Sequence, residues 1–414
     1  MRRSVSVVIV ALLAGCAEPP APDPQAVGQW LRSSLSFVRS ERLGPPVAAR
    51  ISAYGSLALY EGYAADRASG LRSLAGQLNG LTALPQAPSD GVDGASAAAA
   101  AMRVVLDSLF RDGFASTRRT VDSLADAQIA VRAAAGVGDA LSARSVEHGR
   151  SLGAAILAWA AGDGFFETRK RTWTAPKQRE QWENTVTTDQ FVPIMLSGES
   201  DLVAPTNPGL TLELERAGER FVFTNRPKNS AGTTLPTFNP VRPTEPYWGD
   251  LRPLALSDGD ECRPPAPPAY SETSGSPFWK MGKEFADSVT RLDEERRTIA
   301  LFWADNPVAT GTPGFHWISV VNQMIARRGL TAPQAAELYA LTSVAIHDAF
   351  IGTWKEKYRS MVVRPVSYMH RVFDKSFSSV IPTPPFPEYP SGHSTQSAAA
   401  VTVLARLLGD TISF

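Results

Sequence analysis

Cysteine, histidine and net charge are all scarce in this sequence of 414 residues. There are two cysteines, Cys16 and Cys262, so a framework of several disulfides is excluded. The 41 basic side chains are balanced by 41 acidic ones, so no overall positive field favours a nucleic-acid partner. No Cys/His cluster has zinc spacing. Beyond the N-terminus no apolar run reaches about 18 residues, so we expect no membrane-spanning helix.

The first residues are typical of an export signal. Met1-Arg2-Arg3 is basic, Ser4–Leu13 is apolar and short for a membrane span, and Leu13-Ala14-Gly15-Cys16 follows. This stretch resembles the lipobox of bacterial lipoproteins, which implies cleavage before Cys16 and lipidation of its thiol. We therefore expect an exported bacterial lipoprotein, anchored in the membrane by lipid only and facing the periplasm or the cell exterior. An ordinary secretory signal with a chance cysteine is the alternative.

Three segments follow from this interpretation. Residues 1–15 would be the signal peptide, and residues 16–25, with four prolines between Glu18 and Gln25, a tether. Residues 26–414 would form one helical domain. Apolar residues recur at helical spacing in most of it. The predicted helices are Gln25–Arg42, one opened by Pro45-Pro46, Ala64–Leu78, Gly94–Phe110, Thr117–Ala135, Ala140–Ala161, Pro277–Val289, Asp293–Trp303 and one from the Thr331 cap to about Lys355.

Residues 167–277 interrupt the helical pattern. This region is rich in proline, glycine, threonine and asparagine, and its one alternating stretch, Leu210–Asn225, predicts a small β-hairpin. We expect an irregular layer over an all-α bundle, held down by Trp173, Trp182 and Phe191.

An abrupt change of composition marks the candidate site. Residues 381–390 contain five prolines, which exclude a helix, whereas Ser394–Leu408 is proline-free and apolar at helical spacing. Ser391-Gly392-His393 would therefore lie where a stiff loop meets a helix N-terminus, whose free N–H groups favour an anion. His393 adds a group that gains or loses a proton near neutral pH.

Two basic residues complete this pattern. Lys357 and Arg364 are separated by six residues, and Pro365 follows directly. Lysine supplies a compact charge and arginine a fork that grips two oxygens, so with Ser391-Gly392-His393 they would surround a tetrahedral oxyanion. The alternative, solvated charges at a helix end, would explain either residue alone.

Lys-x6-Arg-Pro followed by Pro-Ser-Gly-His resembles the first two signatures of the type 2 phosphatidic acid phosphatase (PAP2) and vanadium haloperoxidase superfamily. The stretches Thr353–Tyr358, Phe302–Asp305 with Gly311-Thr312-Pro313, and Pro384–His393 are similar to fungal vanadium chloroperoxidases and their bacterial relatives. Arg42–Tyr54 is similar to bacterial lipoprotein members of that group. The resemblance implies an all-α helical bundle.

The resemblance also implies roles for individual residues. Lys357, Arg364, Ser391 and the Gly392 N–H would bind the oxygens of vanadate or phosphate, and His393 would be the catalytic acid/base. Asp305 matches a carboxylate that orients an arginine of the site, and Trp354 belongs to the similar stretch around Lys357. Phe386 stands where chloroperoxidases have Phe and bromoperoxidases have His.

One departure from the family concerns its third signature, Arg-x5-His-x3-Asp, which follows Pro-Ser-Gly-His by tens of residues and supplies the vanadium-ligating or nucleophilic His. The sequence given ends at Phe414, so we expect a C-terminally truncated member, inactive as it stands, with that His beyond Phe414. The same string occurs earlier as Arg364-x5-His370-x3-Asp374. We interpret it as a chance match, because it precedes Pro-Ser-Gly-His and Arg364 already serves the first signature.

Three functions stay open. The first is a vanadate-dependent haloperoxidase that oxidises halide with hydrogen peroxide. The second is an acid phosphatase that hydrolyses phosphate monoesters at the same site without a cofactor. The third is a lipoprotein that binds an oxyanion without catalysis. Likeness along the chain, with Trp354 and Phe386, favours the first.

Overall fold

The computed structural model describes residues 19–185, 212–215, 220–223, 242–307, 310–411 and 413. Its helices are α1 (Gln25–Ser40), α2 (Pro45–Ala64), α3 (Gly94–Leu109), α4 (Ala115–Ala134), α5 (Asp139–Ala160), α6 (Phe165–Thr168), α8 (Pro277–Thr290), α9 (Glu294–Trp303), α10 (Thr312–Arg328), α11 (Ala332–Ser360), α12 (Pro365–Val372) and α13 (Gly392–Leu408). Short 3-10 turns lie at η1 (Arg67–Ser69) and η2 (Trp248–Asp250). The predicted all-α fold is confirmed.

Helix α11 connects the two halves of the bundle, since it packs against α2 on one side and against α10 and α13 on another. It begins where the sequence predicts, at a capping box in which Thr331 and Gln334 each accept the other's backbone N–H. It continues to Ser360, so Lys357 lies within its last turn. None of the described helices is both long enough and apolar enough to span a membrane.

Helix α3 is packed unusually closely between α2 and α5, because glycines face its alanine-rich surface. A Cβ on Gly62 of α2 would lie 2.2 Å from the Cα of Ala98, and one on Gly149 of α5 would lie 2.2 Å from the carbonyl oxygen of Ala97. These contacts explain why the Ala97–Ala101 run is buried in the bundle.

The helix predicted over Ala64–Leu78 is wrong. After α2 the chain makes only the turn η1, and Gly70 and Gly76 then adopt left-handed backbone (φ 72° and 78°). The Leu74 N–H, which a helix would pair with a carbonyl, donates to the buried carboxylate of Glu61 (2.7 Å).

The irregular region contains the predicted hairpin as two antiparallel strands, β1 (Leu212–Glu215) and β2 (Arg220–Phe223). Trp182 is buried, its ring is tilted against that of Trp173, and it meets the Tyr358 ring edge-on, as the prediction of an anchoring role requires. Phe191 lies outside the described residues, and so do Cys16 and the predicted signal peptide.

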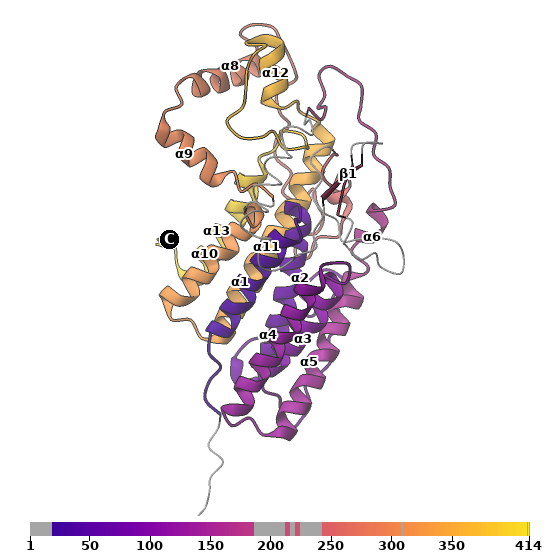
Figure 1. Ribbon diagram of the computed structural model, residues 1–414, viewed down its shortest axis with the longest axis vertical. Helices are drawn as coiled ribbons and strands as arrows, with labels where there is room; N and C mark the ends of the chain where they lie inside the picture. Colours follow the sequence, from indigo (N-terminus) through magenta and orange to yellow (C-terminus); the bar gives the residue numbers. More distant parts are fainter. Residues whose placement is uncertain are drawn as a thin grey trace, which may run out of the picture.

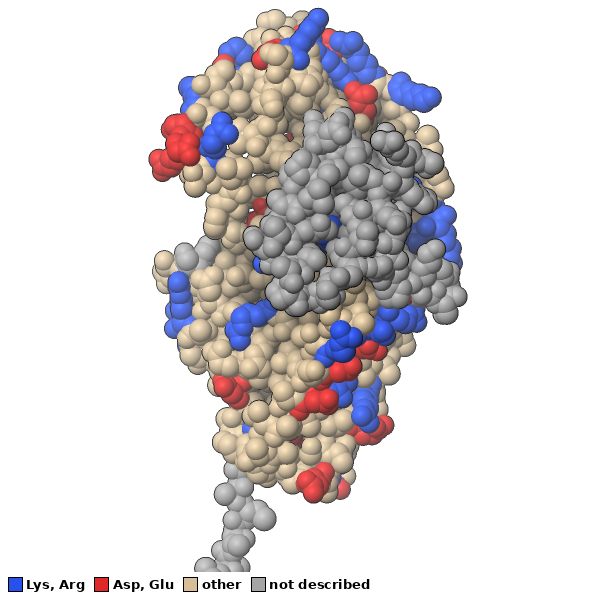
Figure 2. All heavy atoms as spheres, in the orientation of Figure 1, with Lys and Arg blue, Asp and Glu red and all other residues tan. Residues whose placement is uncertain are grey.

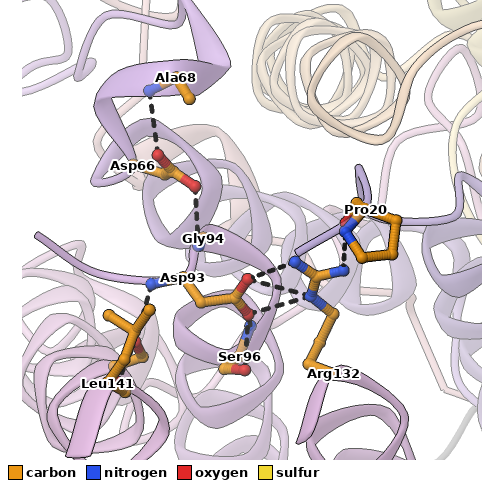
Figure 3. A network of polar contacts seen from close by, with 9 residues as sticks. Pro20, Asp66, Ala68, Asp93, Gly94, Ser96, Arg132 and Leu141 are labelled. Carbon is orange, nitrogen blue, oxygen red and sulfur yellow. Dashed lines mark hydrogen bonds and ion pairs between the residues drawn. The ribbon is translucent and has the colours of Figure 1, made fainter. Parts of the chain in front are cut away.

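Helices α8 and α12 and the start of the described chain lie at opposite ends of the molecule (Figure 1). Near the start of the described chain, Asp93 caps α3 and pairs with Arg132 of α4 (2.7 Å), which also donates to the Pro20 carbonyl (2.7 Å; Figure 3). On the face in Figure 2 the visible basic and acidic side chains are interspersed, as the zero net charge suggests.

Candidate functional site

One pocket contains all eight side chains that the sequence predicts for the site. It has a volume of about 300 Å³ and lies where the ends of α11 and α13 meet α12, α8 and the α9–α10 connection. The eight residues in its wall are Asp305, Trp354, Lys357, Arg364, Phe386, Ser391, Gly392 and His393. Much of the remaining wall is apolar, with Phe285, Phe350, Phe377, Ile381 and several prolines. A small polar cluster thus faces an otherwise apolar cavity, as in many ligand sites.

Lys357 is a buried cation of the pocket, with 1% of its surface exposed. Its Nζ donates to the carbonyl oxygens of Pro387 and Glu388, both at 2.8 Å, so it holds the proline-rich loop against α11. Burial and the neighbouring Arg364 charge lower the pKa of Lys357 well below its ordinary value, and Glu388 opposes this. A bound anion would favour the charged ammonium and raise that pKa again.

Arg364 is the second cation, held at the cap position of α12 with Pro365 in the first turn. Its guanidinium donates to the Glu388 carboxylate and, at 3.3 and 3.4 Å, to the Pro384 carbonyl. The centroid of the Phe386 ring lies 5.0 Å from the Lys357 Nζ and 4.8 Å from the Arg364 Cζ, so one aromatic ring contacts both cations.

The N-terminus of α13 supplies donors to the same pocket. Ser391 is the cap, and its hydroxyl accepts the Ser394 N–H at 3.2 Å. The N–H groups of the first turn have no partner within the helix and carry the positive end of its dipole. A Cβ on Gly392 would meet the Trp354 ring at 3.6 Å, an ordinary contact, so packing does not require glycine here. Close approach of a ligand does explain it.

His393 follows in the first turn and is partly solvent-exposed in the pocket wall. Surrounding protein desolvates its ring and lowers its pKa, while Asp305 and the carbonyls of Trp303 and Ala304 favour the imidazolium and oppose that shift. The ring is therefore set between a hydrophobic wall and a carboxylate, an arrangement suited to moving protons near neutral pH.

Asp305 is itself held by a second histidine, His316. Its buried carboxylate contacts Nδ1 of His316 at 3.0 and 3.2 Å, and the Trp303 ring stacks on His316 at 4.5 Å. The backbone of Asp305 is left-handed (φ 45°), a conformation that aspartate tolerates better than most residues. The carboxylate thus lies between two histidines, one in the pocket wall and one behind it.

Asp305→Asn is expected to lower the pKa of His393 further, because asparagine keeps the shape but removes the charge that stabilises the imidazolium. NMR titration of the ring protons measures this, with His393→Ala assigning the signal. Asp374→Asn, in a carboxylate outside the pocket wall, is the control and should leave the titration unchanged. A His393 pKa that stays constant or rises in Asp305→Asn contradicts the arrangement.

Other histidines lie away from the pocket. His370 is exposed and its Nε2 contacts the Phe377 carbonyl at 2.8 Å, so the early Arg-x5-His string places no histidine among the described wall residues. His347 is fully buried between the rings of Tyr54 and Trp248, and burial lowers its pKa to about 3. Its neighbour Asp348 accepts three backbone N–H groups of residues 254–256, which is a structural role.

The site residues predicted from the sequence do not include Glu388 or His316. Glu388 is a pocket-wall residue that pairs with Arg364, although nothing in the Phe-Pro-Glu-Tyr run predicts that pairing. His316 lies within α10, between the buried residues Phe315 and Trp317. Each contact crosses a loop and depends on how the loop folds, so local patterns do not reveal it.

The donors in this pocket fit a tetrahedral oxyanion. Two cations, a hydroxyl, the N–H groups of a helix N-terminus and an acid/base histidine lie in one cavity with apolar walls. Lys357 contributes most directly, because its buried Nζ, which already donates to the carbonyls of Pro387 and Glu388, would gain a charged partner when an anion binds. Vanadate and phosphate both have the required shape and charge.

Comparisons with known proteins agree with this geometry. The model of the VCPO second helical-bundle domain matches residues 337–414, which include both signatures. The vanadium chloroperoxidase of Curvularia inaequalis is 28% identical over 151 residues, a match covering 30% of this chain. That match spans 25% of the fungal protein's length.

Solved structures extend the likeness to nearly the whole chain. A bacterial vanadium-dependent iodoperoxidase is 30% identical, with a TM-score of 0.74 over 96% of this chain and 83% of the other. A bacterial vanadium-dependent chloroperoxidase in its holo form shares the fold, with a TM-score of 0.58 at 17% identity over 94% of this chain and 80% of the other. On the helical architecture, the signatures and these matches, the chain belongs to the vanadium haloperoxidase superfamily.

Proposed function

We propose that the protein is a vanadate-dependent haloperoxidase that oxidises a halide with hydrogen peroxide. The observation that carries the proposal is the convergence of Lys357, Arg364 and the N-terminus of α13 with His393 in one pocket. Membership of the family supports the proposal. So does the likeness to the bacterial vanadium-dependent iodoperoxidase, whose name describes oxidation of a halide.

Each residue of the pocket has a defined task in this proposal. Lys357 and Arg364 would hold the negative charge of the oxyanion, and Ser391 with the Gly392 N–H would orient it. Bound vanadate would supply the activation of hydrogen peroxide toward halide oxidation. His393 would accept and return a proton at a ring nitrogen facing the pocket, and Asp305 would keep that ring ready to do so. Phe386 and Trp354, whose rings are 5.0 Å apart, would exclude water from one side.

The phosphatase alternative uses the same donors for a phosphate ester. It also needs a nucleophile at phosphorus besides the acid that protonates the leaving oxygen. Among the described wall residues His393 is the single histidine, so both tasks would fall to one side chain. Since the third signature would supply this nucleophile in a phosphatase and the vanadium-ligating histidine in a haloperoxidase, the wall residues do not separate the two functions, and the preference for the haloperoxidase rests on the family likeness.

The test is a pair of assays on the full chain, incubated with and without vanadate. Halide oxidation that requires both vanadate and hydrogen peroxide supports the proposal, and iodide, the most easily oxidised common halide, is the substrate to use first. Hydrolysis of a chromogenic phosphate ester that vanadate inhibits would support the phosphatase instead. If the chain shows neither activity but still binds the oxyanion, the result would support the non-catalytic binding protein.

We also propose that the protein is exported and held at a membrane through lipidated Cys16. The lipobox supports this, and the described chain begins at the end of the molecule opposite helices α8 and α12 (Figure 1). Cys16→Ser should move the protein from the membrane fraction to the soluble fraction, and Cys262→Ser, in the other cysteine, should not. Equal membrane association of Cys16→Ser and the parent would contradict the anchor.

A further inference from the structure

The arginine of the pocket, Arg364, already forms an ion pair with a carboxylate. Glu388 lies in the pocket wall, and one of its carboxylate oxygens accepts a hydrogen bond from the Arg364 guanidinium. The pair is asymmetric in exposure, because the Arg364 side chain is 8% exposed and that of Glu388 is 41% exposed. The buried cation is therefore fixed, and the carboxylate is the member with room to move.

Two hydrogen bonds hold the backbone of Glu388 in place, whereas its side chain is partly exposed. Its N–H donates to the Val362 carbonyl at 3.0 Å, and its own carbonyl accepts from the Lys357 Nζ at 2.8 Å. The carboxylate could leave Arg364 by rotation of side-chain bonds alone, with the loop in place. Such a rotation exposes the guanidinium to whatever anion enters the pocket.

The charges around the pocket give Glu388 a reason to be there. Lys357 and Arg364 both lie within 5.0 Å of the centroid of the Phe386 ring. Without a counter-charge these two buried cations repel each other, because little water screens them. Desolvation acts to raise the pKa of Glu388, but the charges of Arg364 and Lys357 outweigh it, so its pKa is lowered and the group is ionised. It thus balances part of the positive charge when no ligand is bound.

We propose that Glu388 is a built-in counter-anion that pairs with Arg364 in the ligand-free pocket and is displaced when a tetrahedral oxyanion binds. This inference rests on the proposed oxyanion site and adds to it a residue that sets affinity. Every oxyanion must compete with the carboxylate for Arg364, and a displaced carboxylate near the pocket repels more strongly charged anions. Glu388 is a specificity-determining residue in this account, with no direct part in the chemistry.

The test is the affinity of the full chain for inorganic phosphate, measured calorimetrically for the parent and for Glu388→Gln. Glutamine keeps the shape and still accepts from Arg364 but carries no charge. We expect phosphate to bind about tenfold more tightly to Glu388→Gln, since a unit charge a few ångströms from the anion has at least that effect at the effective dielectric of a protein surface. Glu183→Gln removes a carboxylate paired with Arg371 (2.8 Å) outside the pocket wall, and this control should not change the affinity.

A crystal structure of the parent with phosphate bound gives a second readout that needs no variant. Phosphate on Arg364 with the Glu388 carboxylate turned away supports the inference, and an intact Arg364–Glu388 pair beside the phosphate overturns it. Unchanged or weaker phosphate affinity in a folded Glu388→Gln also overturns it, and so does failure of both proteins to bind phosphate. Vanadate-dependent halide oxidation is measured separately, so the proposed function stands or falls independently of this result.

Discussion

In the protein extended through its third signature, His393→Ala should reduce turnover by about 10²- to 10⁴-fold, the range over which a positioned acid/base group acts. The same change should alter oxyanion affinity by less than about tenfold, because Lys357, Arg364 and the N–H groups of α13 remain. The ring contributes through its proton and through the neighbouring charge of Asp305 more than through a contact that holds the anion. The split between turnover and affinity is thus the expected signature.

Steady-state halide oxidation gives turnover, and equilibrium dialysis with vanadate gives affinity. His370→Ala is the matched control, because it removes an exposed histidine that does not line the pocket. Turnover that survives in His393→Ala, or an equal loss in His370→Ala, would show that the acid/base role is assigned to the wrong residue.

Arg364→Ala should weaken oxyanion binding roughly a hundredfold, which corresponds to the loss of about 2–3 kcal/mol of charge-assisted hydrogen bonding. Two effects add in this variant. The fork that grips two oxygens is lost, and the Glu388 carboxylate remains in the pocket without its partner. The oxyanion affinity of Arg364→Lys should lie between those of the parent and Arg364→Ala, because lysine keeps the charge but not the fork.

Dialysis with labelled phosphate measures this loss, and thermal unfolding followed by circular dichroism shows whether the variant stays folded. Arg406→Ala is the control, since it removes an exposed arginine from α13 outside the pocket wall. An Arg364→Ala protein that is folded and binds phosphate like the parent would remove Arg364 from the site.

Local signals in the sequence predicted a large part of this structure, for reasons that are themselves local. The proline run before Ser391 fixes the start of α13, and Thr331 with Gln334 fixes the start of α11. Both signals depend on residues within one turn of the boundary. The prediction failed over Ala64–Leu78, where an apolar pattern hides two left-handed glycines and a backbone N–H captured by Glu61.

In the candidate site, too, some features could be predicted from local sequence and others could not. Lys357, Arg364 and Ser391–His393 follow from the two signatures, although their roles stay predictions. The pairing of Glu388 with Arg364 and of His316 with Asp305 could not be predicted, because each contact crosses a loop whose fold local patterns do not determine. The Lys357 contacts to the proline-rich loop are of this kind as well, since they require α11 to end beside residues 387 and 388.

The most direct test of the account is an equilibrium titration of the unmodified chain with vanadate, repeated with phosphate as competitor. The account predicts one vanadate site per chain from which phosphate displaces the ligand, because both anions would use Lys357, Arg364 and the N-terminus of α13. Vanadate binding that phosphate does not affect, or the absence of saturable binding, would contradict the claim that this pocket is an oxyanion site.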